Sequence, residues 1–446
     1  MASAAEQLAA NLNFGAFSKA TELKKRLWFT LGALIVYRLG TYIPLPGIDP
    51  IILQDIFKQQ AGGILGMFNM FAGGALGRMT IFALNIMPYI SAAIIMQLMT
   101  AISPSLSQLK KEGEQGRKKI NQYTRYGTVL MAAAQAYGIA VGIEGMTGSQ
   151  GSAVTDPGVF FRFTTVITLV GGTIFLMWLG EQVTARGVGN GISLIIFAGI
   201  VAELPSALAA TLELGRTGAM SSGLIGLLLV GAIGVIYGIV FVERAQRRVV
   251  VQYPKRQQGN KMYGGESSHL PLKINTSGVI PLIFASSLLL MPITVIQLSA
   301  GSGPEFLTTI TSFLGRGQPG YLIIFSVLIA FFAFFYTAVV FNPEETAENL
   351  KKNGGFIPGI RPGNNTSQYL DFILTRLTVV GAIYLVAVAI LPELLIARLA
   401  VPFFFGGTSL LIVVSVTLDT VAQVQSHLLA HQYEGLIKKS RLKGRR

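Results

Sequence analysis

The sequence predicts an all-α membrane protein that crosses the bilayer ten times. Three observations lead to this fold class. Of the 446 residues, 51% are hydrophobic and only 13% are charged, about half the charged share of a typical soluble domain. Apolar stretches of about 20 residues, the length that crosses the hydrocarbon of a bilayer, recur along the whole chain. The basic residues gather in alternate connectors between these stretches.

The apolar stretches place the ten spans at 24–43, 77–99, 122–143, 159–180, 190–208, 222–242, 275–297, 319–341, 370–391 and 403–427. With the N-terminus taken as cytoplasmic, 26 of the 35 Lys and Arg residues fall in cytoplasmic segments and 5 on the opposite side. Such a bias sets the orientation of membrane proteins. Both termini are therefore predicted to be cytoplasmic, which agrees with an even number of spans. The first 18 residues lack the basic start and apolar core of a cleavable signal peptide, so the first span is expected to direct insertion.

The spans divide into five and five around a polar connector. This division predicts two pseudo-symmetric halves that enclose a central path, because both halves contain a span interrupted by Pro or Gly. The predicted units are an N-terminal tail (1–23), the half with spans 1–5 (24–208), the outer connector (209–221), the half with spans 6–10 (222–427) and a basic C-terminal tail (428–446).

Two cytoplasmic loops, 243–274 and 342–369, are about 30 residues long and exceed what a helix connector needs. The first contains the run VVVQY before a basic tip with glycines, which is typical of a short β-hairpin. Loops of this length are either functional or disordered. We favour a docking surface for a cytoplasmic partner.

Residues 62–75 read GGILGMFNMFAGGA and do not behave like a span. About ten apolar residues between glycine pairs are too few to cross a bilayer. One interpretation is a helix that lies on the membrane surface. The other is a re-entrant segment that enters the centre as a movable stopper, since irregular backbone at membrane depth survives only against protein or a water-filled cavity.

Pro88 is expected to kink the second span because proline removes a helical hydrogen bond. Ile86 and Ile90 flank this proline on one helical face, and Ile280 and Ile283 lie beside Pro281 in the seventh span. Aliphatic side chains on pore-facing helices can form a constriction that excludes water and ions. Each isoleucine taken singly is better explained by ordinary packing.

Catalytic chemistry is not expected of this chain. It has no cysteine and three histidines, and it lacks a phosphate-binding loop or a nucleophile–base pair. His427 and His431 are expected at the polar end of the last span, and RGVGNG at 186–191 is expected to be a tight turn. Polar residues such as Gln97 and Asp419 are too sparse to form a proton or ion relay through the spans. We therefore expect no enzymatic activity, no cofactor and no metal.

Several long motifs resemble the bacterial SecY family, whose members form the channel of the Sec protein translocase. The resemblance runs from about residue 20 to 440 and is carried by MFNMFAGGAL (67–76), IMPYISAAIIMQL (86–98), KKEGEQGRKKINQYTRYGT (110–128), LPLKINTSGVIP (270–281), FNPEETAENLKKNGGFIPGIRPG (341–363) and VPFFFGGTSLLIVVSVTLD (401–419). It implies an hourglass-shaped pore between spans 1–5 and 6–10, with a short plug helix at 62–75. The implied plug residues are Ile64, Leu65, Met67, Phe68, Asn69, Met70 and Phe71. The implied pore ring is Ile86, Ile90, Ile196, Ile280, Ile283 and Ile412.

The resemblance also implies a lateral gate and a docking site. Spans two and three would face spans seven and eight across the gate, with Gln97, Thr124 and Asn275 as its polar residues. The docking site for the SecA ATPase and the ribosome would comprise Arg247, Arg248, Lys255, Arg256, Lys261, Lys351, Lys352 and Arg361, and ribosomal RNA would be contacted only there. Further implied partners are the SecE and SecG subunits, signal sequences, nascent chains, membrane lipids, YidC and SecDF. The implied location is the bacterial inner (plasma) membrane.

Two other classes of protein also have many spans. A secondary transporter or lipid flippase would require charges or ion sites near the midplane of the membrane, and these are sparse in the sequence. A membrane-embedded protease would require a catalytic pair within the spans, and none is evident. Transport of a small solute by the purified chain, or turnover of a substrate without partners, would favour these classes.

Overall fold

The structure is a computed structural model of the chain. It describes residues 20–59, 69, 72–145, 147–148, 151–218, 221–253, 256–258, 261–263, 267–298, 318–399 and 407–443.

A helix lies at each of the ten predicted spans. These helices are α3 (Thr21–Gly40), α6 (Met87–Ile102), α8 (Glu114–Glu144), α9 (Val159–Arg186), α10 (Gly191–Arg216), α11 (Ser222–Arg244), α12 (Ile280–Leu298), α14 (Pro319–Val340), α16 (Asn364–Leu399) and α17 (Gly407–Lys443). Within the described residues, seven helices are long and apolar enough to cross a membrane. An eighth is added if α6 and the short α7 (Pro104–Lys111), which meet at a 98° bend, form one span. The chain is therefore a multi-pass membrane protein.

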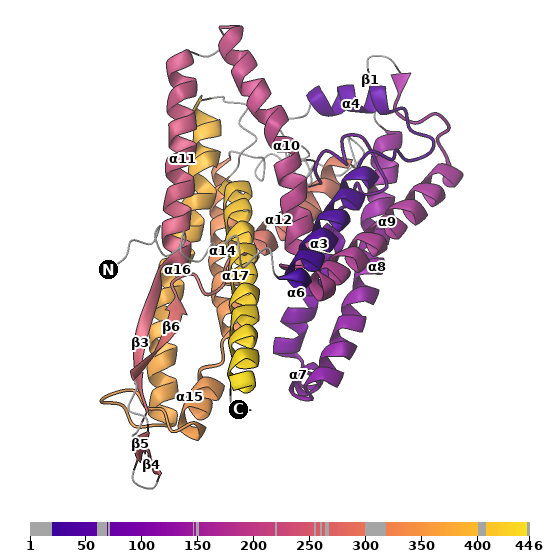
Figure 1. Ribbon diagram of the computed structural model, residues 1–446. Helices are drawn as coiled ribbons and strands as arrows, with labels where there is room; N and C mark the ends of the chain where they lie inside the picture. Colours follow the sequence, from indigo (N-terminus) through magenta and orange to yellow (C-terminus); the bar gives the residue numbers. More distant parts are fainter. Residues whose placement is uncertain are drawn as a thin grey trace.

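The helices form two groups that meet along two seams (Figure 1). In the first group, α9 packs against α3, α8 and α10, and α8 packs against α6. In the second group, α14 packs between α12 and α16, and α16 contacts α17. One seam is formed by α12 against α6 and α8, and the other by α10 against α11 and α17. One continuous apolar core spans both groups.

The second predicted span differs from expectation. Helix α6 begins only at Met87, and residues 72–86 form a series of turns that is almost entirely buried. Pro88 therefore lies in the first turn of α6 and does not kink it, because a proline at that position removes no intrahelical hydrogen bond. The irregular backbone is tolerated at this depth because protein covers it.

The predicted connector and the predicted C-terminal tail are largely helical. Most of the connector 209–221 belongs to α10, which continues to Arg216. The predicted C-terminal tail begins within α17, which continues to Lys443. Helix α16, with 36 residues, is about 54 Å long at 1.5 Å per residue. Hydrophobicity locates only the part of a helix that lies in lipid, so it misses polar extensions such as these.

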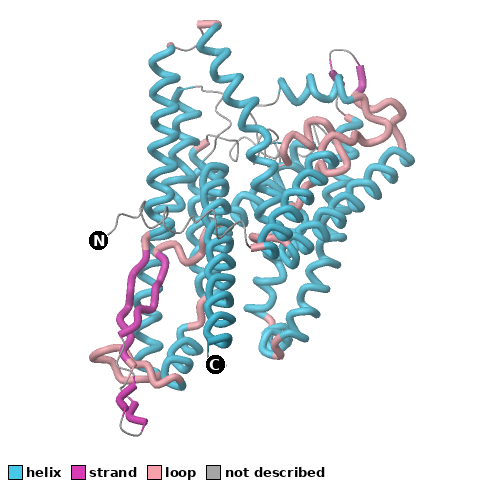
Figure 2. The backbone as a smooth tube through the Cα atoms, in the orientation of Figure 1, coloured by secondary structure: helices cyan, strands magenta, loops and turns pink. Residues whose placement is uncertain are grey.

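The predicted β-hairpin is confirmed (Figure 2). Strand β3 (Gln246–Gln252) pairs antiparallel with β6 (Ser267–Lys273), and β4 (Arg256–Gln258) pairs with β5 (Lys261–Tyr263) nearer the tip. The hairpin, α7 and α15 (Pro343–Lys352) lie at one end of the molecule, which we call the basic end (Figure 1). The opposite end carries α4 (Pro50–Gln59), β1 (Thr147–Gly148) and β2 (Gly151–Ser152).

The two long loops form one unit at the basic end. Gln252 of β3 and Phe356 exchange two backbone hydrogen bonds of 2.9 and 3.0 Å. Beneath them, buried apolar side chains of the hairpin, the second loop and α16 form a separate small core: Val249, Val251, Leu272, Ile357, Leu370, Ile373 and Leu374. The hairpin is thus fixed to the helix bundle.

Candidate channel, gate and docking surface

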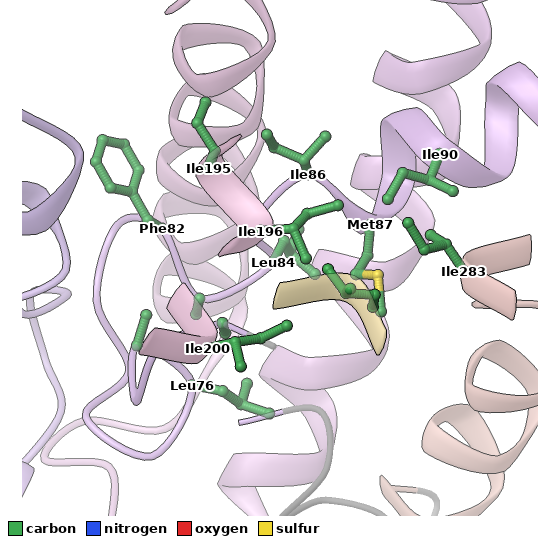
Figure 3. Close-up of a cluster of buried hydrophobic side chains, with 14 of the residues drawn as sticks. Leu76, Phe82, Leu84, Ile86, Met87, Ile90, Ile195, Ile196, Ile200 and Ile283 are labelled. Atoms are coloured by element: carbon green, nitrogen blue, oxygen red, sulfur yellow. The ribbon is translucent and has the colours of Figure 1, made fainter. Parts of the chain in front are cut away.

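Five of the six predicted ring isoleucines surround one small cavity at the junction of the two helix groups. Each has at most 8% of its surface exposed. Figure 3 shows side chains from α6, α10 and α12 approaching this space. The five are Ile86, Ile90, Ile196, Ile283 and Ile412. Because they come from four different parts of the chain, only the tertiary fold brings them together.

The cavity between these isoleucines has a volume of about 10 Å³, at the lower limit of what a single water molecule needs. Its remaining lining consists of Asn85, Met87 and Ser286, which the sequence reasoning missed. Asn85 and Met87 flank the predicted ring residue Ile86, and Ser286 lies one helical turn after Ile283. These spacings are the signal in the sequence that could have indicated them. Ile280 does not line the cavity, and instead lies half-buried against the main core at the start of α12. The constriction is closed.

The segment that leads to α6 is anchored beside this constriction. Arg38 of α3 donates a hydrogen bond to the carbonyl of Gly73 at 2.8 Å, and Arg78 donates to the carbonyls of Gly73 and Gly74 at 3.0 and 3.1 Å. Both guanidinium groups also lie over the ring of Tyr42. Gly73 has a φ of +64° and lies so close to α10 that a Cβ atom would be 3.0 Å from the backbone there, so a side chain would be strained at this position.

Of the predicted plug residues, the structure describes Asn69. Its side chain accepts a hydrogen bond from the amide of Gly77 at 2.6 Å, and its carbonyl accepts one from Gly74 at 2.8 Å. Residues 72–75 are buried within the bundle, which favours the re-entrant interpretation over a helix on the membrane surface. Ile64, Leu65, Met67, Phe68, Met70 and Phe71 lie outside the described residues.

The predicted gate helices are in contact, and two of the three predicted gate residues lie on them. Gln97 of α6 is half-buried, and its Oε1 atom has no hydrogen-bond partner among the described residues. Thr124 of α8 is buried and donates to the carbonyl of Ile120 within its own helix at 3.0 Å. Asn275 lies before α12 begins and bonds to Glu243 of α11, so its side chain joins two elements of the second helix group.

The predicted docking residues gather at the basic end. Arg247 and Arg248 are exposed on β3, Lys351 and Lys352 on the last turn of α15, and Arg361 in the loop that follows. Figure 1 shows the hairpin and α15 side by side at this end. Arg256 and Lys261 lie on β4 and β5 nearer the tip, and Lys255 lies outside the described residues. Two loops distant in sequence therefore present one basic surface.

These features define a multi-span membrane protein with a closed apolar constriction between two helix groups. The sequence profile of the SecY family matches residues 80–421. A relative in Escherichia coli K12, named protein translocase subunit SecY, is 56% identical over 424 residues, which cover 95% of this chain and 96% of the relative. A relative of the same name in Rickettsia conorii is 56% identical over 429 residues, covering 96% and 99%. The chain belongs to the SecY family.

Solved structures share the fold. One described as the structure of a protein conducting channel has a TM-score of 0.67 at 19% identity, covering 92% of this chain and 93% of that chain. Sec61 in a canine ribosome–channel complex from the endoplasmic reticulum has a TM-score of 0.63 at 18% identity, with the same coverage. At these identities the likeness establishes the architecture of the helices.

Proposed function

We propose that this chain is the central protein-conducting channel of the Sec translocon in the bacterial inner membrane. It passes unfolded secretory polypeptides across the membrane and releases membrane segments into lipid. The observation that carries this proposal is the ring of five buried isoleucines where the two helix groups meet. A ring at the junction of two helix groups opens around a chain when the groups part, whereas a carrier needs polar ligands for a specific solute.

The aliphatic ring suits a channel for polypeptides of any sequence. Isoleucine side chains form no specific hydrogen bonds with the translocating chain, so they seal around it without selecting particular residues. In the closed state, the same side chains exclude water and ions by dewetting. The seam of α12 against α6 and α8 is the lateral gate of this proposal. A signal sequence is an apolar helix that favours lipid. When it binds at the seam, its contacts replace the packing of α12 against α6 and α8 that is lost when the gate opens.

The orientation of the chain follows from the distribution of its charges. The basic hairpin, α7 and α15 lie at one end of the molecule (Figure 1), and Lys and Arg mark the cytoplasmic side of membrane proteins. Leu23 near the start of α3 packs with Leu428 of α17, which supports placing both termini on that side. The basic surface is then available to the ribosome and to SecA, which supply the work of translocation. SecE and SecG are the proposed membrane partners, with YidC and SecDF as further ones.

The plug is tested by ion conductance of the purified complex in planar bilayers. We expect the wild type to conduct almost no ions. Deletion of residues 62–73 should produce frequent openings, because it removes the stopper and leaves only the short constriction to block ions. A signal peptide should then open the wild type as well. If both proteins stay silent even with signal peptide and SecA present, the plug assignment is wrong and a transporter must be reconsidered.

A further inference from the structure

A hydrogen-bonded cluster, buried at Asn275 and half-buried at Glu243, joins the docking hairpin to the gate helix α12. Only Ala245 separates α11 from β3, and residues 274–279 connect β6 to α12. Glu243, in the last turn of α11, accepts a hydrogen bond from the side-chain amide of Asn275, with 2.7 Å between Oε1 and Nδ2. The two side chains thus bridge the base of the hairpin, where the chain enters it and where the chain leaves it.

Asn275 also forms hydrogen bonds within the connector 274–279. Its amide donates a second hydrogen bond to the carbonyl of Gly278 at 3.0 Å, and its Oδ1 accepts one from the hydroxyl of Ser277 at 3.0 Å. Asn275 and Ser277 are 3% and 5% exposed. A hydrogen bond to a carboxylate is stronger than one between neutral groups, and a buried amide left without its partner is costly. The cluster therefore holds the connector in one conformation.

Backbone contacts add to this rigidity. The amide of Ile274 donates to the carbonyl of Ala245 at 3.1 Å, which extends the pairing of β3 and β6 by one step. Gly381 of α16 lies so close that a Cβ atom at this position would be 3.1 Å from the carbonyl oxygen of Ile274. The connector is consequently held between α11 and α16, and the Glu243–Asn275 bond is one of the contacts that hold it there.

The other side of α12 faces the first helix group. Ile283 lines the closed constriction, and the hydroxyl of Ser287 bonds to the sulfur of Met87 on α6 at 3.6 Å. The segment before α12 is therefore bonded at the base of the hairpin, and the first turns of α12 contact the first helix group at the seam.

We propose that Glu243 and Asn275 are positioning residues that couple docking of a cytoplasmic partner on the hairpin to movement of α12 at the gate. The inference rests on the proposed channel function. With the bond intact, the hairpin and α12 move together as one rigid unit. Without it, residues 274–279 bend independently and partner docking no longer reaches the seam, whereas a signal peptide that binds at the seam still opens it.

The experiment uses the absence of cysteine from the chain. The pair M87C/S287C places two thiols across the seam, and the rate at which they form a disulfide under a mild oxidant reports closure. The rate is measured on the complete complex in lipid vesicles, alone, with ATP-bound SecA, and with a synthetic signal peptide. The backgrounds are wild type, E243A, E243Q, and E213A as the matched control, since Glu213 is an exposed carboxylate in an ion pair with Arg216 on α10.

In the wild type, SecA and the signal peptide should each slow disulfide formation by about fivefold, the lower end of typical coupling between two sites. In E243A, the effect of SecA should disappear although SecA still binds, and the effect of the signal peptide should remain. E243Q retains an acceptor oxygen but not the charge, so it should keep most of the SecA effect, and E213A should behave as the wild type.

A wild-type response of E243A to SecA would overturn the inference. Loss of the signal-peptide response in E243A would overturn it too, because the variant would then have damaged the gate itself. A wild type that responds to neither addition would instead contradict the proposed channel function.

Discussion

The hydroxyl of Ser287 on α12 donates a hydrogen bond to the thioether sulfur of Met87 on α6, with 3.6 Å between oxygen and sulfur. This contact crosses the seam between the two helix groups beside the closed constriction. Sulfur is a weak acceptor, so separation of the two helices leaves little hydrogen-bond energy unmet. A seam built from such a contact and from apolar packing suits a gate that must part and close repeatedly.

The first prediction concerns a covalent lock across this seam. The variant M87C/S287C should form a disulfide while the seam is closed, because the side chains at these two positions meet across it. Protein export into vesicles should then fall about tenfold under oxidising conditions, a change of about 1.4 kcal/mol or more in the effective barrier. A reductant should restore it. Export that is equally fast with the bond formed would contradict opening at this seam.

The second prediction concerns the ring. Replacing Ile196 and Ile283 together by serine should raise the ion conductance of the resting channel, because the hydroxyl groups favour water in a constriction that otherwise excludes it. Conductance in planar bilayers measures the effect. The matched control is I233S on α11. This isoleucine is 68% exposed and does not line the constriction. Equal conductance of the ring variant and the control would argue against a sealing role of the ring.

The third prediction concerns the basic surface. Reversing the charge of exposed Arg361 should weaken ribosome binding about tenfold at physiological salt and reduce the dependence of affinity on salt, since fewer counterions are released from RNA phosphates. Co-sedimentation over a series of salt concentrations measures both. R216E, at the opposite end of the molecule and 81% exposed in its side chain, is the matched control. An equal loss in both variants would indicate a general charge effect and contradict a local docking site.

The fourth prediction concerns the small core under the hairpin. Leu370 is fully buried there, and truncation to alanine should destabilise this unit by about 2–5 kcal/mol, the usual cost of an unfilled leucine site. Limited proteolysis should then cleave the hairpin faster, and partner binding should weaken while the closed channel stays tight. L227A on α11, where the leucine is 67% exposed, should change neither. A leaky L370A channel would show that this core also supports the constriction.

Much of the architecture was predictable because the membrane imposes a simple rule on the sequence. Every apolar stretch predicted as a span overlaps a helix, and the run VVVQY indeed forms part of a hairpin strand. The start of α6 was predicted wrongly. Residues 77–86 are apolar enough for a span, yet protein surrounds them on all sides and tolerates turns there, as the left-handed backbone of Met79 and Asn85 illustrates.

The site was predictable in part. The family resemblance selected the ring isoleucines, and five of six meet around the cavity. Ile280 does not, because it sits one turn earlier on α12 than Ile283. Asn275 is predicted as a polar gate residue, but the sequence does not reveal that the partner of its amide is Glu243, 32 residues earlier in the chain. Hydrogen-bond partners at that separation depend on how strands and helices pack.

The sequence by itself determined that the chain spans a membrane and how its basic residues are distributed. Hydrophobicity and charge act locally, so a linear pattern is enough to read them. The tertiary structure decided which isoleucines meet, that two remote loops form one basic surface, and that Glu243 bridges the base of the hairpin to Asn275. These relationships join residues far apart in the chain, and only the packing of the helices brings such residues within contact distance.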